Sequence, residues 1–218
     1  MKIDKAYKLR METHKEMKRR IMENAADLFR KHGYQTTTMD DIAESLQISK
    51  VRIYRYWNSK EEILYETVRI VHKDLINSLK IITESKQHPD EKLRAAIANH
   101  ATVFYTAILP VFGGIISPET LLTSKHKLTI IKLRDEYDSL LRHIIDEGSE
   151  KKIFIKCNSK LISFAILGAA NYMTTWFSDE GHMSFEEVIG YISDYLINGI
   201  LMEKHNEVWP APRKSVQH

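Results

Sequence analysis

Residues 37–64 read TTMDDIAESLQISKVRIYRYWNSKEEIL, and the predicted architecture of the chain follows from this segment. Its first apolar residues recur at the spacing of one helical face, at Met39, Ile42, Ala43 and Leu46. Thr38 can cap this short helix, and Asp41 three residues later makes a weak capping box. The chain then turns at Gln47, and Ser49 caps a second short helix. Two short helices joined by a tight turn predict a helix-turn-helix unit.

The second helix combines an apolar inner face with an outer face of cations and phenols. Arg52 can bind the O6 and N7 atoms of guanine, and Val51 can pack against a thymine methyl group. Lys60 begins the next helix, where its ammonium and the helix N-terminus both favour a DNA phosphate. The residues that we expect to face double-stranded DNA are Thr38, Lys50, Val51, Arg52, Tyr54, Arg55, Tyr56 and Lys60.

The distribution of charge agrees with this interpretation. Residues 1–60 hold 14 Lys and Arg against 8 Asp and Glu, whereas the remaining residues hold 18 against 21. A basic N-terminal head on a mildly acidic body suits binding to phosphates. Cys157 is the only cysteine, which excludes a disulfide framework. The N-terminus has no apolar signal core, so we expect a cytoplasmic protein.

The rest of the chain also predicts helices. Two uncharged stretches, 95–118 and 161–178, contain polar residues, prolines or glycines that favour buried helices over membrane spans. We expect an all-α fold, with a three-helix DNA-binding head and a larger helical body for ligand binding and dimerisation. The predicted domains are 1–58, 59–206 and a loose tail, 207–218. The predicted helices span 13–32, 39–46, a short helix from 50, 59–85, 90–109, 124–150, 159–177 and 184–203. Residues 1–12 are expected to form a flexible arm or an extension of the first helix.

Over about 50 residues the chain resembles the TetR family of transcriptional regulators. The matching segments are Gly33-Tyr34, Thr37 to Ala43, Ile48 to Lys50, Tyr54 to Trp57 and Ser59 to Leu64. The resemblance implies a homodimeric, ligand-responsive repressor that binds a pseudo-palindromic operator. It also implies that the last two helices pair across a two-fold axis, for which we expect the apolar Phe185–Ile200 stripe and the Gly168 face to be used. Gln47, Val51 and Arg52 depart from the family pattern, which puts the base preference in doubt.

A second resemblance covers about 11 residues, Leu167 to Phe177. The segment is similar to the penultimate helix of TetR-type regulators that sense acyl-CoA thioesters. It implies a fatty acyl-CoA as the effector; a drug-like or aromatic effector, as in regulators of efflux, and a constitutive DNA binder without an effector are the alternatives. The expected lining of the ligand pocket is His100, Phe104, Tyr105, Ile108, Phe112, Arg134, Phe164, Asn171, Tyr172 and Trp176.

Catalytic chemistry is not predicted. The histidines are scattered, and none has a carboxylate at metal-binding spacing. The chain has no Gly-rich phosphate loop, and Cys157 has no evident base near it in the sequence. We therefore expect neither an enzyme, nor a metal site, nor a bound cofactor.

Overall fold

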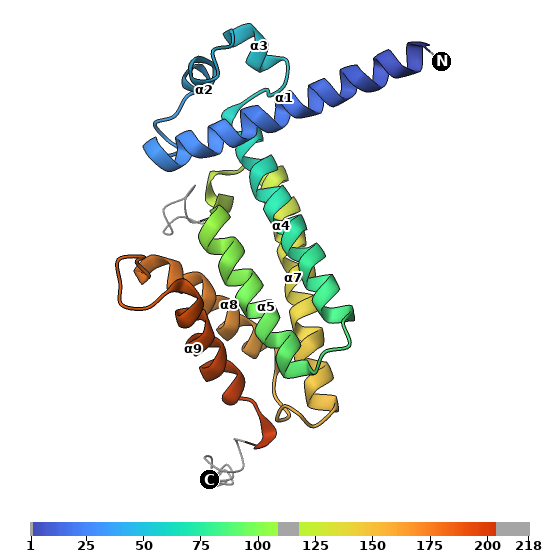
Figure 1. Cartoon of the computed structure of the whole chain (residues 1–218), viewed down its shortest axis with the longest axis vertical. Coiled ribbons are helices and arrows are strands. Elements are labelled where there is room, and N and C mark those ends of the chain that lie inside the picture. The colour runs from blue at the N-terminus through green and yellow to red at the C-terminus, as the bar shows by residue number, and fades with distance from the viewer. Residues whose placement is uncertain (1, 109–117, 204–218) are drawn as a thin grey trace. The chain divides into compact units, whose positions relative to one another are not determined.

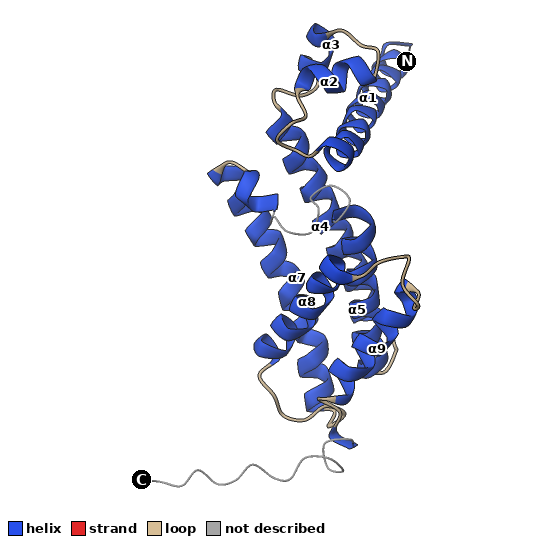
Figure 2. Cartoon of the chain, turned by 90° about the vertical axis from the view of Figure 1, so that its left-hand side faces the viewer, coloured by secondary structure: helices blue, strands red, loops and turns tan. Residues whose placement is uncertain are grey.

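The computed structural model describes the backbone of residues 2–108 and 118–203, together with their side chains except at residues 2–13, 108, 118, 119 and 174. Every named element in this part of the chain is a helix, as Figure 2 shows. The helices form two compact units, Met1–Asp74 with Val103–Arg134, and Leu75–Thr102 with Asp135–His218. The predicted all-α class is confirmed. None of the helices that the structure describes combines the length and the apolar character needed to cross a membrane.

The first unit contains the helix-turn-helix (Figure 1). Its elements are α1 (Lys2–His32), α2 (Met39–Ser45), α3 (Lys50–Tyr54), the first part of α4 (Lys60–Glu84), the π-helical turn η1 (Phe104–Ile108), the 3-10 turn η2 (Pro118–Leu121) and the start of α7 (Ser124–Glu150). Apolar side chains from α1 to α4, joined by one from α7, form its core: Ile21, Ala25, Phe29, Met39, Ile42, Ala43, Ile53, Trp57, Ile63, Leu64, Val68 and Ile130. The unit extends past the predicted domain boundary at residue 58, because α4 supplies part of this core.

The caps of the first unit follow the sequence closely. Gly33 has a φ of 85° and donates its N–H to the Phe29 carbonyl at 2.8 Å, so it ends α1 in the left-handed conformation that favours glycine. The helix begins at Lys2, so residues 2–12 extend α1, the second of the two predicted alternatives. At the start of α4, Ser59 accepts the N–H of Glu62 at 3.1 Å. Glu62 does not return the bond to Ser59, and its carboxylate accepts the backbone N–H of Asn58 at 2.8 Å instead.

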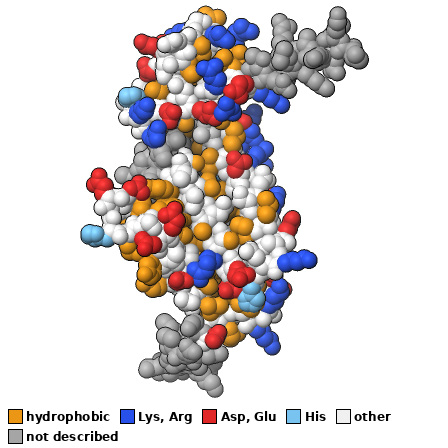
Figure 3. All heavy atoms as spheres, viewed as in Figure 1, with side chains coloured by type: hydrophobic (Ala, Val, Ile, Leu, Met, Phe, Trp, Pro, Cys, Tyr) orange, Lys and Arg blue, Asp and Glu red, His pale blue; other side chains and the backbone are white. Residues whose placement is uncertain are grey.

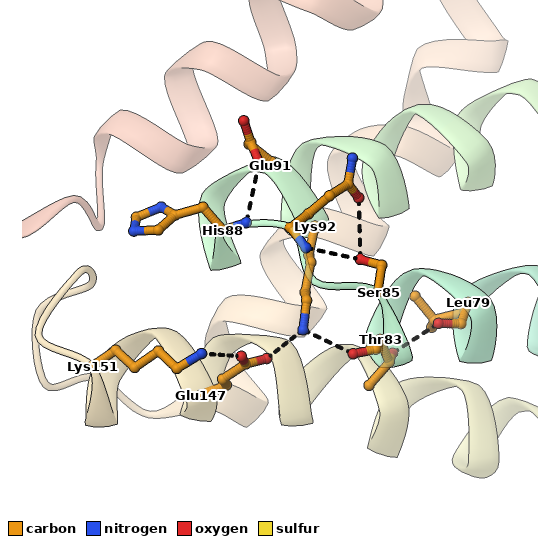
Figure 4. Close-up of polar contacts among 9 residues, drawn as sticks. Leu79, Thr83, Ser85, His88, Glu91, Lys92, Glu147 and Lys151 are labelled. Atoms are coloured by element: carbon orange, nitrogen blue, oxygen red, sulfur yellow. Dashed lines mark hydrogen bonds and ion pairs between the residues drawn. The ribbon is translucent and has the colours of Figure 1, made fainter.

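The second unit holds the remaining parts of α4 and α7, together with α5 (Pro89–Val103), α8 (Ser159–Trp176) and α9 (Phe185–Asn198). A buried lysine crosses between its helices, as Figure 4 shows. Lys92, only 4% exposed, donates to the Thr83 carbonyl at 2.8 Å and to the Glu147 carboxylate at 3.0 Å. The second oxygen of Glu147 accepts from Lys151 at 2.6 Å. This ion-pair network connects α4, α5 and α7.

Two helices end earlier than predicted. The helix expected to reach residue 109 is α-helical only to Val103, where a π-helical turn follows. The last helix, expected to reach residue 203, ends at Asn198. Its successor Ile200 accepts the N–H of Ile155 at 2.8 Å, and Met202 donates to the Ile153 carbonyl at 2.9 Å. The carbonyl of Ile200 and the N–H of Met202 thus bond to the α7–α8 connection, whereas the N–H groups of Ile200 and Leu201 still bond to the Ile197 carbonyl.

Helices α8 and α9 pack against each other (Figure 1). On the face of the molecule that Figure 3 shows, hydrophobic side chains gather over α9. Much of the stripe that we expected to pair two chains is already buried within one. Phe185, Val188, Ile189 and Ile200 are at most 9% exposed, and Ile192 and Leu196 are half-buried. This part of the dimer prediction is wrong, because the inner side of α9 covers the core of its own unit. The exposed apolar residues of the outer faces are Leu161, Phe164, Tyr172, Trp176, Tyr191 and Tyr195. We call them the α8–α9 outer face.

Candidate nucleic-acid interface

Helix α2 is held by reciprocal bonds at its first turn. Thr38 accepts the N–H of Asp41 at 3.1 Å, and the Asp41 carboxylate accepts the N–H of Thr38 at 2.8 Å. The hydrogen bonds from the backbone and then the side chain of Thr38 lower the pKa of Asp41 below its ordinary value. The carboxylate stays ionised and keeps the box closed at neutral pH. Thr38 is exposed at this helix N-terminus, where it can also face a phosphate.

The turn between α2 and α3 requires an unusual backbone conformation. Gln47 has a φ of 54°, in the left-handed region, and donates to the Glu44 carbonyl at 2.9 Å. Ile48 follows with a bond of 3.0 Å to the Ala43 carbonyl. A glycine adopts this conformation without steric cost, which explains why glycine is usual in this turn. Gln47 adopts it at a steric cost.

Helix α3 is buried on one side and exposed on the other. Ser49 accepts the N–H of Arg52 at 3.2 Å, and Ile53 has no exposed surface. Val51 is 76% exposed and Tyr54 45% exposed. The side chains that the exposed surface of this segment presents are Lys50, Val51, Arg52, Tyr54 and Arg55. A short helix that is buried on one side and cationic on the other has the composition of a recognition helix.

The cations of this surface differ in whether an acidic side chain pairs with them. Lys50 forms an ion pair of 2.7 Å with Asp40, and this hydrogen bond raises the pKa of Lys50. Among the described residues, Arg52 and Arg55 have no such acidic partner. The two guanidinium groups are therefore the cations most available to an incoming polyanion.

Tyr56 and Lys60 are half-buried, and both contact other residues of the first unit. The Tyr56 ring lies 4.8 Å from the ring of His14 on α1. The Lys60 ammonium donates to the carbonyls of Tyr34 and Thr37, at 2.5 and 2.7 Å, and more weakly to that of Gln35, at 3.3 Å. Desolvation lowers its pKa. Sequence reasoning missed this clamp, because its partners lie more than 20 residues away and carbonyls leave no signal in the sequence.

The residues predicted to bind a ligand fall in different places. His100 and Asn171 come together in the second unit, where the His100 Nε2 atom lies 2.8 Å from the Asn171 Oδ1 atom. Phe164, Tyr172 and Trp176 are exposed on the α8–α9 outer face. Phe104, Tyr105, Ile108 and Arg134 belong to the first unit.

Two of those residues cannot be examined further. Phe112 lies outside the described residues, and so does the side chain of Ile108. Within the described part of the chain, no group of three or more His, Cys, Asp or Glu side chains is arranged to hold a metal ion.

Comparisons with known proteins agree on this architecture. The chain matches the family model described as bacterial regulatory proteins, tetR family, over residues 21–67. It matches a second model, described as tetracyclin repressor-like, C-terminal domain, over residues 86–200. The biofilm operon icaADBC negative transcriptional regulator IcaR of Staphylococcus aureus is 36% identical over 72 residues, 33% of this chain and 38% of that protein. The match thus spans little more than a third of the length of this relative.

Solved structures extend the similarity to most of the chain. The crystal structure of the TetR family transcriptional regulator PfmR from Thermus thermophilus is 34% identical with a TM-score of 0.73, over 81% of this chain and 96% of that one. The structure of AibR in complex with isovaleryl coenzyme A and operator DNA is 20% identical with a TM-score of 0.70, over 85% of this chain and 98% of that one. At the latter identity the likeness concerns the fold.

Proposed function

Because the chain belongs to the TetR family of bacterial regulatory proteins, we propose that it is a transcriptional repressor that binds a pseudo-palindromic operator as a homodimer and is released by a hydrophobic effector. The observation that carries the proposal is the exposed cationic surface of α3 on a fully buried support. In two copies, such helices occupy half-sites separated by about 34–36 Å, one turn of B-DNA. In this proposal residues 1–58 form the DNA-binding head, residues 59–206 form the body for ligand binding and dimerisation, and residues 207–218 are the tail.

Each residue of the head has a role in this proposal. Arg52 and Val51 read base edges, since they are exposed at the start of α3. The residues that position the head on phosphates are Thr38, Lys50, Tyr54, Arg55, Tyr56 and Lys60. Lys60 acts through its charge, because carbonyls already take its hydrogen bonds.

The homodimer uses the α8–α9 outer face. Monomeric proteins rarely leave a contiguous apolar patch of this kind uncovered, and aromatic residues are enriched at interfaces. Gly168 supports the proposal, since a methyl group in place of its hydrogen would meet no atom within 4 Å and a second helix can approach there. The proposed interface therefore includes the predicted Gly168 face, and it uses Tyr191 and Tyr195 in place of the buried α9 stripe.

The effector is a fatty acyl-CoA. AibR, which has the same fold, was crystallised with isovaleryl coenzyme A and operator DNA. The second unit contains a buried hydroxyl group, that of Tyr137, which has no hydrogen-bond partner among the described residues. Burial raises the pKa of Tyr137, so the group is neutral and can donate to a thioester carbonyl. His100, whose ring lies 5.4 Å from that of Tyr137, and its partner Asn171 lie beside this donor.

The test is fluorescence anisotropy with labelled DNA from the promoter region of the protein's own gene. Specific binding, with release by palmitoyl-CoA but by neither free CoA nor palmitate, supports the whole proposal. Specific binding that ignores acyl-CoA retains the repressor and excludes this effector. Absence of specific binding to any upstream fragment contradicts the repressor itself.

A variant tests the predicted thioester contact. Tyr137→Phe keeps the ring and removes the hydroxyl, so we expect release to need about tenfold more palmitoyl-CoA, the cost of one hydrogen bond. Ser139→Ala, which removes an exposed hydroxyl from the same helix, is the control. Equal sensitivity of the two variants would exclude Tyr137 from the effector site.

A further inference from the structure

A cavity of about 360 Å³ opens within the first unit, lined by residues of α1, the α3–α4 connection, α4 and the first turn of α7. Cavities of this volume lie within the range that small ligands occupy. The proposed function does not use it, because its effector site lies in the second unit. The charges of its wall show what kind of ligand it can bind.

The two carboxylates of the wall are already satisfied by the protein. Glu62 accepts the backbone N–H and the side-chain amide of Asn58, at 2.8 and 2.9 Å. Glu66 accepts from Arg69 at 2.7 Å, and this bond is the main cause of its lowered pKa, with smaller contributions from cations that include Lys18. Because both carboxylates already have partners, the wall of the cavity offers no unpaired carboxylate to a cationic ligand.

The cations of the wall are less fully engaged. Arg19 is held by two glutamates of its own helix. Lys15 has no ion pair among the described residues, and Lys18 rests its ammonium 4.5 Å from the centre of the Trp57 ring. A cation over an aromatic face keeps its charge available to an anion. Lys15 and Lys18 lie about one helical turn apart on α1, and a carboxylate can bridge them.

The remaining wall is aromatic and rigid. Tyr65 and His126 stack with their ring centres 3.8 Å apart and their planes at 6°. His126 is fixed by Glu61, whose carboxylate oxygens lie 2.9 and 3.0 Å from the Nδ1 atom. Glu61 is fixed in turn by the N–H of Thr123, at 2.9 Å. A planar ligand can therefore stack on a wall that needs no rearrangement.

We propose that this cavity is a binding site for a small aromatic carboxylate of one or two fused rings. The carboxylate binds between Lys15 and Lys18, and the ring system packs against Trp57 and the stacked pair of Tyr65 and His126. The site belongs to the first unit, so it is separate from the effector site proposed for the second unit and does not depend on it.

The test is isothermal titration calorimetry of the full chain, without DNA, with 2-naphthoate. We expect saturable binding of one molecule per chain. Lys18→Gln should weaken the binding of 2-naphthoate about tenfold, because it removes the charge-assisted hydrogen bond between a half-buried lysine and the carboxylate. Lys15→Gln should weaken it about threefold, because Lys15 is exposed. Lys31→Gln, which removes an exposed charge from the other end of α1, is the matched control and should bind like the wild type.

Two further probes test the chemistry. Neither 2-naphthalenemethanol, which lacks the charge, nor inorganic phosphate, which lacks the ring, should bind at the concentrations that saturate with 2-naphthoate. Binding of either probe with equal affinity would overturn the proposal, as would absence of 2-naphthoate binding. Binding that is unchanged in both lysine variants would place the ligand elsewhere and overturn it too. Thermal melts identical to that of the wild type show that the exposed substitutions leave the fold intact.

Discussion

The outer surface of α3 and the α8–α9 outer face are opposites in chemistry and in origin. The first carries lysine, arginine and tyrosine on a five-residue helix, and the second carries leucine, phenylalanine, tryptophan and tyrosine on two long helices. The orientation of α3 is set by bonds between residues three or four apart, such as that between Ser49 and Arg52. The orientation of α8 and α9 is set by the helices that they cover. A short, capped segment can be interpreted from the sequence alone, whereas a long apolar helix cannot be oriented without its neighbours.

The largest expected effect concerns the apolar surface. Phe164→Asp places a charge at the centre of the proposed dimer interface, so we expect the dimer to dissociate with a cost above about 3 kcal/mol, as at interface hot spots. Sedimentation velocity measures the change. Ile81→Asp, at a side chain that is 72% exposed on α4 of the same unit, is the matched control and should leave the dimer intact. A Phe164→Asp protein that still sediments as a dimer contradicts the assignment of the α8–α9 outer face.

The next effect separates buried from exposed ion pairs in the second unit. Lys92→Met leaves the half-buried Glu147 with Lys151 alone, and we expect the free energy of unfolding to fall by about 3 kcal/mol. Lys80→Met breaks a pair of 2.7 Å with Glu136 in which both side chains are 46% exposed, and should cost less than about 1 kcal/mol. Urea denaturation at neutral pH gives both values. Equal losses would mean that burial does not distinguish the two pairs.

On the cationic surface, Arg52→Ala should reduce operator affinity by about 2 kcal/mol and relax the choice of base at one position. Lys50→Ala should cost less, because the charge of that lysine is already paired with Asp40. Anisotropy titrations with the operator and with singly substituted operators measure affinity and specificity together. If Arg52→Ala weakens every sequence equally, the arginine contacts a phosphate and does not read a base.

A smaller effect tests the two roles of Lys60. Lys60→Met removes the clamp on the carbonyls of residues 34–37, and we expect the free energy of unfolding to fall by about 1.5 kcal/mol. If its charge also acts on a phosphate, the salt dependence of DNA binding falls by about one phosphate contact. An unchanged salt slope with lowered stability would assign the lysine to the fold alone.

Much of the first unit could be predicted from the sequence because its signals are local. The predicted caps at Thr38 and Ser49 are both confirmed. The clamp of Lys60 and the ion pair between Lys50 and Asp40 were not predicted, since they join residues that only the folded chain brings together.

The second unit was harder to predict for a physical reason. Residues 161–178 carry no charge, so periodicity does not separate the buried side of α8 from its exposed side. The sequence therefore does not show that Phe164, Tyr172 and Trp176, which we expect to line a pocket, are exposed in the single chain. The early end of α9 was equally hidden, because it depends on backbone bonds to Ile153 and Ile155, about 45 residues earlier in the chain.

The smallest expected effect returns to the turn between α2 and α3, where local rules are strongest. The φ of 54° at Gln47 carries a steric cost, and Gln47→Gly removes it. The gain is partly offset by the greater entropy of glycine in the unfolded chain, so we expect a net stabilisation of about 0.5 kcal/mol. Glu44→Gly, an exposed position within α2, is the matched control and should destabilise by about 1 kcal/mol. Opposite signs from two glycine substitutions three residues apart, measured by thermal unfolding, would show that backbone conformation decides the effect at this turn.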